Sequence, residues 1–186
     1  MYAGENVLAT SLGNANAMMH PAPTLLNTSL IESGNDWLYY WDGITPSIGA
    51  FVEALDEERL AVASAFGLQI PGILEWYKVH YGVERATLSE TVKQNQAYAE
   101  VQGQKTLHTR YLLEDIPTGL VPMAFLGKLA GVGVDRMETV IKLGEFMTGQ
   151  DLTSTGRTLE NLGLAGMTTA DIQSYLKTGV RKPIAG

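Results

Sequence analysis

TPSIGAFVEALDEERLAVASAFG occupies residues 45–67 and has the pattern of one long amphipathic helix. Thr45 is a favourable N-cap, and Pro46 suits the first helical position. Behind them, apolar side chains recur at three- and four-residue spacings, which is the period of one helix face. They are Ile48, Phe51, Val52, Leu55, Val62, Ala63 and Phe66. The stretch therefore predicts a helix from residue 46 to about 66 that ends near Gly67.

Outward from this helix, capping pairs predict more helices. Thr87 with Glu90 opens one that reaches about Val101, Asp135 with Glu138 opens another, and Thr168 with Asp171 begins a last one. Gly179 suits the C-terminal cap of the last helix. We expect further helices at about 6–19, 23–33, 71–80 and 119–130. Only the aromatic run 37–41 favours an extended conformation, and no strand leads into a glycine-rich turn, so the predicted class is all-α.

Composition narrows the classes of protein. The chain has 186 residues, 45% hydrophobic and 18% charged, which is typical of one globular domain. No apolar run reaches the roughly 18 residues of a membrane span. A net charge of −7 argues against nucleic acid as a partner. With no cysteine there are no disulfides or thiolate metal sites, and we expect a cytoplasmic protein.

The stretch NANAMMHPAP, residues 14–23, places a histidine where a helix must break. Pro21 removes a backbone donor and pushes His20 away from helical geometry. Histidine is also the side chain best matched to proton transfer near neutral pH. Alternatively, His20 makes only a structural hydrogen bond at a helix end.

The stretch KTLHTRYLLEDIP, residues 105–117, carries an arginine and an aspartate five positions apart. Arg110 has the planar guanidinium that clamps a carboxylate, and Asp115 is the kind of group that orients a catalytic histidine. In the structural alternative, Glu114 and Asp115 cap a helix that starts near Pro117.

Other polar and aromatic residues carry less information. GRTLENLG, residues 156–163, predicts a tight loop in which Arg157 is structural or lies at a domain interface. The aromatics, including Trp76, belong to the core or to a pocket wall. The three histidines lack the spacing of a helical metal site, so we predict no bound metal. No serine lies in a nucleophile-elbow pattern, which argues against a hydrolase.

Several motifs together resemble the opine dehydrogenase family: NANAMMHPAPTLLN, YYWDGITPSI with EALDEERLAVASAFG, TRYLLEDIPTGLVPM and GRTLENLGL. The resemblance runs from about Leu8 to Leu164. It implies a helical C-terminal domain of the 6-phosphogluconate dehydrogenase type, packed against an NAD(P)-binding Rossmann domain that is absent from residues 1–186. Enzymes of this family condense an α-keto acid with an amino acid and reduce the imine with NAD(P)H.

The resemblance also implies roles for single residues. His20 matches the proton-transfer histidine of the family, Asp115 its aspartate partner, and Arg110 the arginine expected to bind a substrate carboxylate. Asn16 matches an asparagine that lines the cleft. We assign Trp76 to the substrate-binding residues as well, among the aromatics that shape the amino-acid pocket. The cofactor-binding residues are left unassigned, and we expect no cofactor to bind this chain alone.

Three explanations for the missing half stay open. The chain is a fragment, one subunit of a split enzyme, or a free-standing helical module that binds or dimerises without catalysis. A ketopantoate-reductase-like fragment is a further alternative, against which the His-Pro and Arg-Tyr motifs argue. If the chain self-associates, we expect a homodimer through the face that would meet the missing domain. The sequence leaves open the amino acid, the keto acid and the choice between NADH and NADPH.

Overall fold

The long helix predicted first forms the axis of the molecule. A computed structural model describes residues 6–181, and in it α5 (Pro46–Ala65) runs through the middle of the fold. Thr45 caps it by accepting a hydrogen bond from the Ile48 amide, and Val52, Leu55 and Val62 are fully buried. The predicted helix and its apolar face are therefore confirmed.

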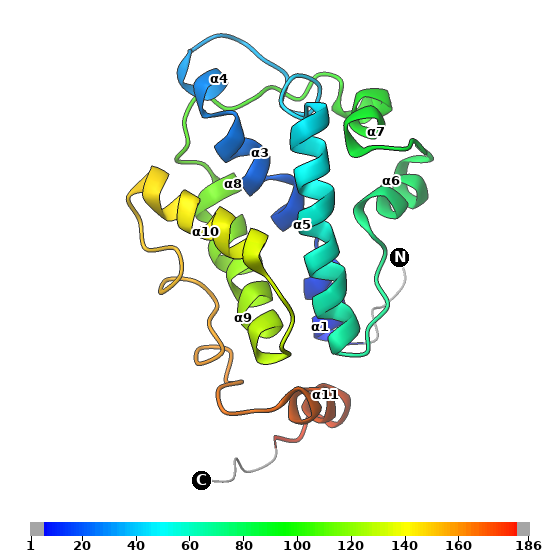
Figure 1. The fold of residues 1–186 in the computed structure, drawn as a ribbon, viewed down its shortest axis with the longest axis vertical. Helices are drawn as coiled ribbons and strands as arrows, with labels where there is room; N and C mark the ends of the chain where they lie inside the picture. Colours follow the sequence, from blue (N-terminus) through cyan, green and yellow to red (C-terminus); the bar gives the residue numbers. More distant parts are fainter. Residues whose placement is uncertain (1–5, 182–186) are drawn as a thin grey trace.

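The remaining helices pack around α5 (Figure 1). On one side lie α9 (Val121–Leu129) and α10 (Asp135–Thr148), and on the other lie α6 (Ile73–Tyr81) and α7 (Leu88–Gln94). The N-terminal part supplies four short helices that also reach α5 or its neighbours. They are α1 (Val7–Leu12), α2 (Asn16–Met19), α3 (Pro21–Leu26) and α4 (Thr28–Glu32).

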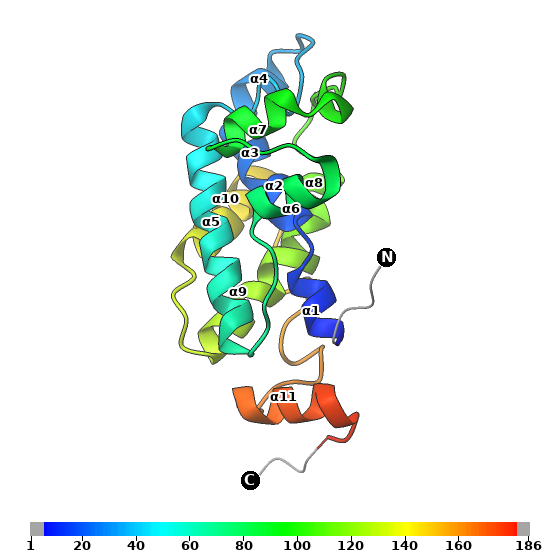
Figure 2. The same ribbon diagram turned by 90° about the vertical axis from the view of Figure 1, so that its right-hand side faces the viewer.

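Short irregular helices complete the centre of the molecule. The 3-10 turn η1 (Gln96–Tyr98) follows α7, and α8 (Arg110–Leu113) leads into the π-helical turn η2 (Ile116–Leu120) before α9. Figure 2 shows α11 (Thr169–Thr178) at one end of the molecule, close to α1. Within residues 6–181 the only extended pairing is a single bridge between Leu38 and Gln102, and none of the helices there is long and apolar enough to cross a membrane. The predicted all-α class is confirmed.

Several predicted boundaries were wrong. The helix expected at 6–19 is interrupted at residues 13–15, where the Asn14 side chain accepts a hydrogen bond from the Asn16 amide and starts a new helix. The helix expected at 23–33 begins at Pro21 and breaks at Asn27, whose side-chain amide donates to the carbonyls of Pro23 and Gly43. The helix expected to reach Val101 ends at Gln94.

Candidate active site

His20 lies at the junction of two short helices, where Pro21 forces the break that the sequence predicts. It is the C-cap of α2 and the N-cap of α3, and it is buried, with 4% of its surface exposed. Its Nδ1 lies 2.8 Å from Oδ2 of Asp115, which is also buried. Because a carboxylate accepts hydrogen bonds, Nδ1 carries a proton, and Nε2 of the neutral ring has a free lone pair.

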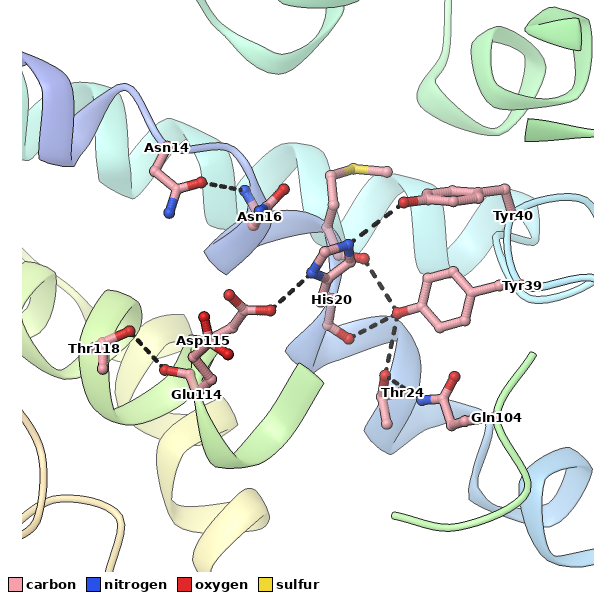
Figure 3. Close-up of polar contacts among 11 residues, drawn as sticks. Asn14, Asn16, His20, Thr24, Tyr39, Tyr40, Gln104, Glu114, Asp115 and Thr118 are labelled. Carbon is pink, nitrogen blue, oxygen red and sulfur yellow. Dashed lines mark hydrogen bonds and ion pairs between the residues drawn. The ribbon is translucent and has the colours of Figure 1, made fainter. Parts of the chain in front are cut away.

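The far side of the ring faces two tyrosines, and Figure 3 shows His20 between them and Asp115. The Tyr40 hydroxyl lies 3.4 Å from Nε2, so it can donate to that nitrogen. Burial raises the pKa of Tyr40, which therefore keeps its proton. The Tyr39 hydroxyl donates to the His20 carbonyl at 2.8 Å and so fixes the backbone.

Tyr111 covers one face of the imidazole. The two rings are stacked, with centroids 3.9 Å apart and an angle of 10° between their planes. Burial raises the pKa of Tyr111, the nearby Arg110 lowers it, and Asp115 raises it. The Arg110 guanidinium carbon lies 5.7 Å from the centre of the Tyr111 ring, and its side chain is exposed. Tyr111 thus stands between the arginine and the histidine.

The contacts of Asp115 do not agree with the structural alternative, in which this residue only caps the helix that starts near Pro117. Asp115 is the residue before η2, but its side chain makes no capping hydrogen bond there and instead binds His20. The two residues lie 95 positions apart in sequence, and the family resemblance was the signal that joined them. Near Asp115, the Thr118 hydroxyl donates a separate hydrogen bond to the Glu114 carbonyl (Figure 3).

The other expected site residues lie at different distances from this pair. Asn16 is exposed one turn before His20, and its carbonyl accepts the His20 amide proton. Trp76 lies on α6 and contacts Tyr77, His80 and Tyr81. That group reaches the histidine only through Tyr98, which stacks on Tyr40 at 4.0 Å. Trp76 therefore belongs to the same aromatic cluster without a recorded contact to His20.

Two site residues were missed by sequence reasoning. Thr24 binds the Tyr39 hydroxyl at 3.1 Å, and the Gln104 side-chain amide donates to Thr24 at 2.9 Å. Thr24 lies in the quoted HPAPT stretch, but Gln104 lies in a loop without a motif and 80 positions from its partner. Among residues 6–181, no three His, Asp or Glu side chains gather as metal ligands.

Comparison with known proteins finds a family and relatives that match most of this chain. Residues 3–148 match the family described as NAD/NADP octopine/nopaline dehydrogenase, alpha-helical domain. An opine dehydrogenase from Arthrobacter sp. (strain 1C) is 49% identical over 94% of this chain and 49% of its own length. Vitopine synthase from Allorhizobium ampelinum is 34% identical over 82% of this chain and 43% of its own.

The fold has a counterpart among solved structures. Octopine dehydrogenase, solved with NADH and L-arginine, superimposes with a TM-score of 0.73 at 19% identity, over 96% of this chain and 51% of the solved one. The same enzyme solved with NADH and pyruvate gives 0.71 over 97% and 50%. This chain thus spans about half the length of the proteins that it matches, and it shares the fold of their helical part.

Proposed function

The chain belongs to the octopine/nopaline dehydrogenase family, and from that membership we propose that it is the C-terminal substrate-binding half of an opine-type dehydrogenase. The complete enzyme would condense an α-keto acid with an amino acid and reduce the product with NAD(P)H. The observation that carries the proposal is the buried contact between His20 and Asp115. We propose that residues 1–186 act as one cytoplasmic helical domain with this role.

In this proposal His20 moves the proton. Condensation requires a group that takes a proton from the attacking amine and gives it to the oxygen that leaves the keto carbon as water, so that the group returns to its starting state. Nε2 of His20 is suited to this because Asp115 holds the other ring nitrogen and stabilises the protonated ring. Such a group typically contributes about 10²–10⁴-fold to the rate.

Arg110, Asn16 and Trp76 are proposed to contact the substrates. The exposed guanidinium of Arg110 can clamp a carboxylate one aromatic ring away from His20. Asn16 is exposed on the turn that precedes His20, where it can line the cleft. Trp76 would form the far wall of a pocket for the amino-acid side chain. The aromatic cluster that ends at Tyr40 would connect this wall with the histidine site.

In this proposal the dinucleotide site is not built by residues 6–181 alone. No strand with a glycine-rich turn occurs between residues 6 and 181, so the reduction step belongs to a nucleotide-binding half. That half, on the same gene product or on a separate chain, is the proposed partner. NAD(P)H bound there would supply the hydride.

An apolar groove offers a surface for this partner. It has a volume of about 230 Å³ and lies between α1, α9, α11 and the loop that holds Arg157. Val7 and Leu162 on its wall are 67% and 38% exposed. Thr118, three residues after Asp115, also lines it, so a partner seated here would border the histidine site. Exposed apolar surfaces of this kind commonly mark an interface.

Activity in a mixture of halves tests the proposal. NADH and NADPH oxidation would be followed with pyruvate and a panel of amino acids, first with this chain alone and then with the nucleotide-binding half of a related opine dehydrogenase added. We expect turnover only in the mixture, and we expect His20→Ala to abolish it. The matched control is His108→Ala, because His108 is exposed and lies outside the site.

Two alternatives predict other outcomes. A free-standing module that binds or dimerises would stay silent in the mixture and would self-associate as a homodimer, which sedimentation measures. A ketopantoate-reductase-like fragment would support reduction of a keto acid without any amine. Amine-independent turnover would therefore count against the opine reaction while leaving the two-half arrangement intact.

A further inference from the structure

The Tyr40 hydroxyl lies beside the reactive nitrogen of His20, opposite the Asp115 carboxylate. It is 3.4 Å from Nε2, whereas Asp115 lies against Nδ1. Figure 3 shows the two groups on opposite sides of the imidazole ring. The hydroxyl is therefore on the side to which the free lone pair of Nε2 points.

The contact between the hydroxyl and Nε2 is long for a hydrogen bond in a protein interior. On the other side of the ring, Nδ1 lies 2.8 Å from Asp115, and most hydrogen bonds of this kind are shorter than about 3.2 Å. Catalytic hydrogen bonds are often long before the substrate binds, and they tighten in the complex. A substrate atom that approaches the lone pair of Nε2 comes within reach of the Tyr40 hydroxyl as well, because both lie on the same side of the ring.

The surroundings of Tyr40 hold its hydroxyl in place and keep the proton on it. The ring stacks on Tyr98, with centroids 4.0 Å apart and 13° between the planes, and it meets Tyr39 edge to face at 5.1 Å. Burial raises the pKa of Tyr40, so the hydroxyl stays a donor. A donor that is already oriented stabilises a developing negative charge without reorganisation.

We propose that Tyr40 is a second catalytic residue, whose hydroxyl donates a hydrogen bond to the keto oxygen while Nε2 of His20 takes protons from the amine. Once the amine has attacked, the nitrogen and the oxygen are bonded to the same carbon, so two protein atoms 3.4 Å apart can contact both at the same time. The acceptor for the nitrogen and the donor to the oxygen are thus different residues. This inference rests on the proposed function.

The protons of the condensation balance with His20 as their carrier. The amine enters as an ammonium ion, and Nε2 takes one proton from it, so that the nitrogen lone pair can attack the keto carbon. The carbonyl electrons move to the oxygen, where the Tyr40 hydroxyl stabilises the charge until Nε2 delivers that proton. Nε2 then moves a second proton from the nitrogen to the same oxygen. The carbon–oxygen bond breaks as water leaves, and the nitrogen lone pair forms the double bond of the iminium ion that the hydride reduces.

The first measurement uses the 186-residue chain by itself. Tyr40→Phe removes the hydroxyl and keeps the stacked ring, so we expect the fold to be retained. The ¹⁵N shift of His20 Nε2 should move toward the value of a free lone pair, while that of Nδ1, held by Asp115, should stay in place. The control is Tyr81→Phe, which removes the hydroxyl of an exposed tyrosine on α6 and should change neither shift. An unchanged Nε2 shift in Tyr40→Phe would show that the hydroxyl does not reach this nitrogen and would overturn the inference.

The second measurement uses the mixture of halves with pyruvate and an amino acid that the wild-type mixture accepts. Tyr40→Phe should lower kcat by about 10²–10³-fold, the usual effect of removing one donor to a developing oxyanion. The KM for the amino acid should stay the same, because the amine contacts His20 and not Tyr40. Tyr81→Phe should keep the wild-type kcat.

The reverse reaction separates the step that uses Tyr40 from the hydride transfer. When the mixture oxidises its own opine product, the hydride leaves first and water adds to the iminium ion afterwards. In Tyr40→Phe we expect the first turnover to form NAD(P)H at the wild-type rate and the later turnovers to be slow. His20→Ala should slow both phases, because the nitrogen must lose a proton before the hydride leaves. An equal decrease of both phases in Tyr40→Phe would mean that the hydroxyl acts through packing, and the inference would be wrong.

The two proposals fail in different ways. If the wild-type mixture shows turnover that depends on His20 and Tyr40→Phe matches it, the role of Tyr40 is wrong and the opine reaction stands. If the wild-type mixture shows no turnover that depends on His20, the proposed function is wrong, and the assignment of Tyr40 is wrong with it.

Discussion

The imidazole of His20 is held from three sides by groups with different effects. Asp115 sets which ring nitrogen carries the proton, Tyr111 restricts ring rotation by stacking, and Tyr39 fixes the backbone carbonyl. A histidine held in this way loses little entropy when a substrate arrives, and its Nε2 points at one place. Under the proposed function, this chain would therefore form the reactive geometry before a nucleotide-binding half binds.

Asp115→Asn tests the role of the aspartate at this scale. An asparagine amide can donate to Nδ1, which would move the ring proton to Nε2 and leave no lone pair there. We expect the variant to fold and the turnover of the mixed halves to fall by at least about a hundredfold. The ring ¹⁵N shifts of His20 would report the change of tautomer.

The control for this variant is Asp135→Asn, an exposed aspartate at the start of α10. It should leave both the turnover and the His20 shifts unchanged. An Asp115→Asn protein with normal turnover would show that the aspartate has only a packing role.

The sequence predicts part of this site. His20 and Asp115 were paired through their motifs, and the break at Pro21 followed from proline chemistry alone. Gln104 and Thr24 could not be joined in this way, because their contact spans 80 positions and depends on how the loop of Gln104 packs on α3. Tyr39 and Tyr40 come to lie in contact with each other beside the His20 ring only after that packing is formed.

At the scale of helices, local signals located starts better than ends. The capping box of Thr168 and Asp171 is present, and Thr87 accepts the Glu90 amide as expected. The breaks at Asn14 and Asn27 were missed because asparagine side chains compete for backbone hydrogen bonds only when a partner is in reach. The Asn27 partner, the Gly43 carbonyl, is 16 residues away.

Buried charges join the helices in a way that the helical pattern does not reveal. Arg59 on α5 donates to Asp56 at 2.7 Å and to the carbonyls of Leu12 and Pro71. Asp56 also accepts the Ile73 amide at the start of α6. One pair of residues thus fastens the end of α1 and the beginning of α6 to the central helix.

Arg59→Met should be strongly destabilising. The substitution leaves the Asp56 carboxylate buried without its counter-ion and two carbonyls without donors, which typically costs about 3–5 kcal/mol. Urea unfolding followed by circular dichroism measures this. Lys78→Met, which breaks the exposed pair with Glu84, is the control and should leave the unfolding midpoint in place.

Gly103 is required by the aromatic ring that packs on it. A Cβ at this position would lie 2.0–2.4 Å from ring atoms of Trp37, whose backbone carbonyl also accepts the Gly103 amide. We expect Gly103→Ala to cost about 1–3 kcal/mol and to shift the neighbouring Gln104. Gly133→Ala has open space around it and should have little effect; equal costs for the two variants would contradict the steric argument.

At the scale of the whole molecule, the aromatic cluster connects the histidine site to the surface. It runs from Tyr39 and Tyr40 through Tyr98 and Tyr77 to Trp76 on α6. The elements that contribute to it are the 37–41 segment, η1 and α6, and α6 lies on the side of α5 away from α10 (Figure 1). The proposed proton transfer and the helix packing therefore depend on the same rings.

This cluster should make the protein sensitive to alkali. Burial raises the pKa of Tyr39, Tyr40, Tyr77 and Tyr98 above the ordinary value of about 10. The unfolded chain loses these protons near pH 10 and the folded chain does not, so stability is complete below about pH 10 and is lost above it. The slope is about 1.4 kcal/mol per pH unit for each protected tyrosine.

Urea unfolding at a series of pH values, together with tyrosinate absorbance, measures this loss. Because the clustered hydroxyls ionise only when the helices separate, we expect the absorbance to rise together with the loss of helical circular dichroism. Tyr77→Phe removes one of the titrating groups and should make the decline of stability with pH shallower. The exposed Tyr81 also contributes to the total absorbance, so the signal of the cluster is the part that is lost in Tyr77→Phe. Appearance of that part near pH 10 in a chain that keeps its helical signal would mean that the cluster opens without unfolding, and the histidine site would then be open to solvent by the same route.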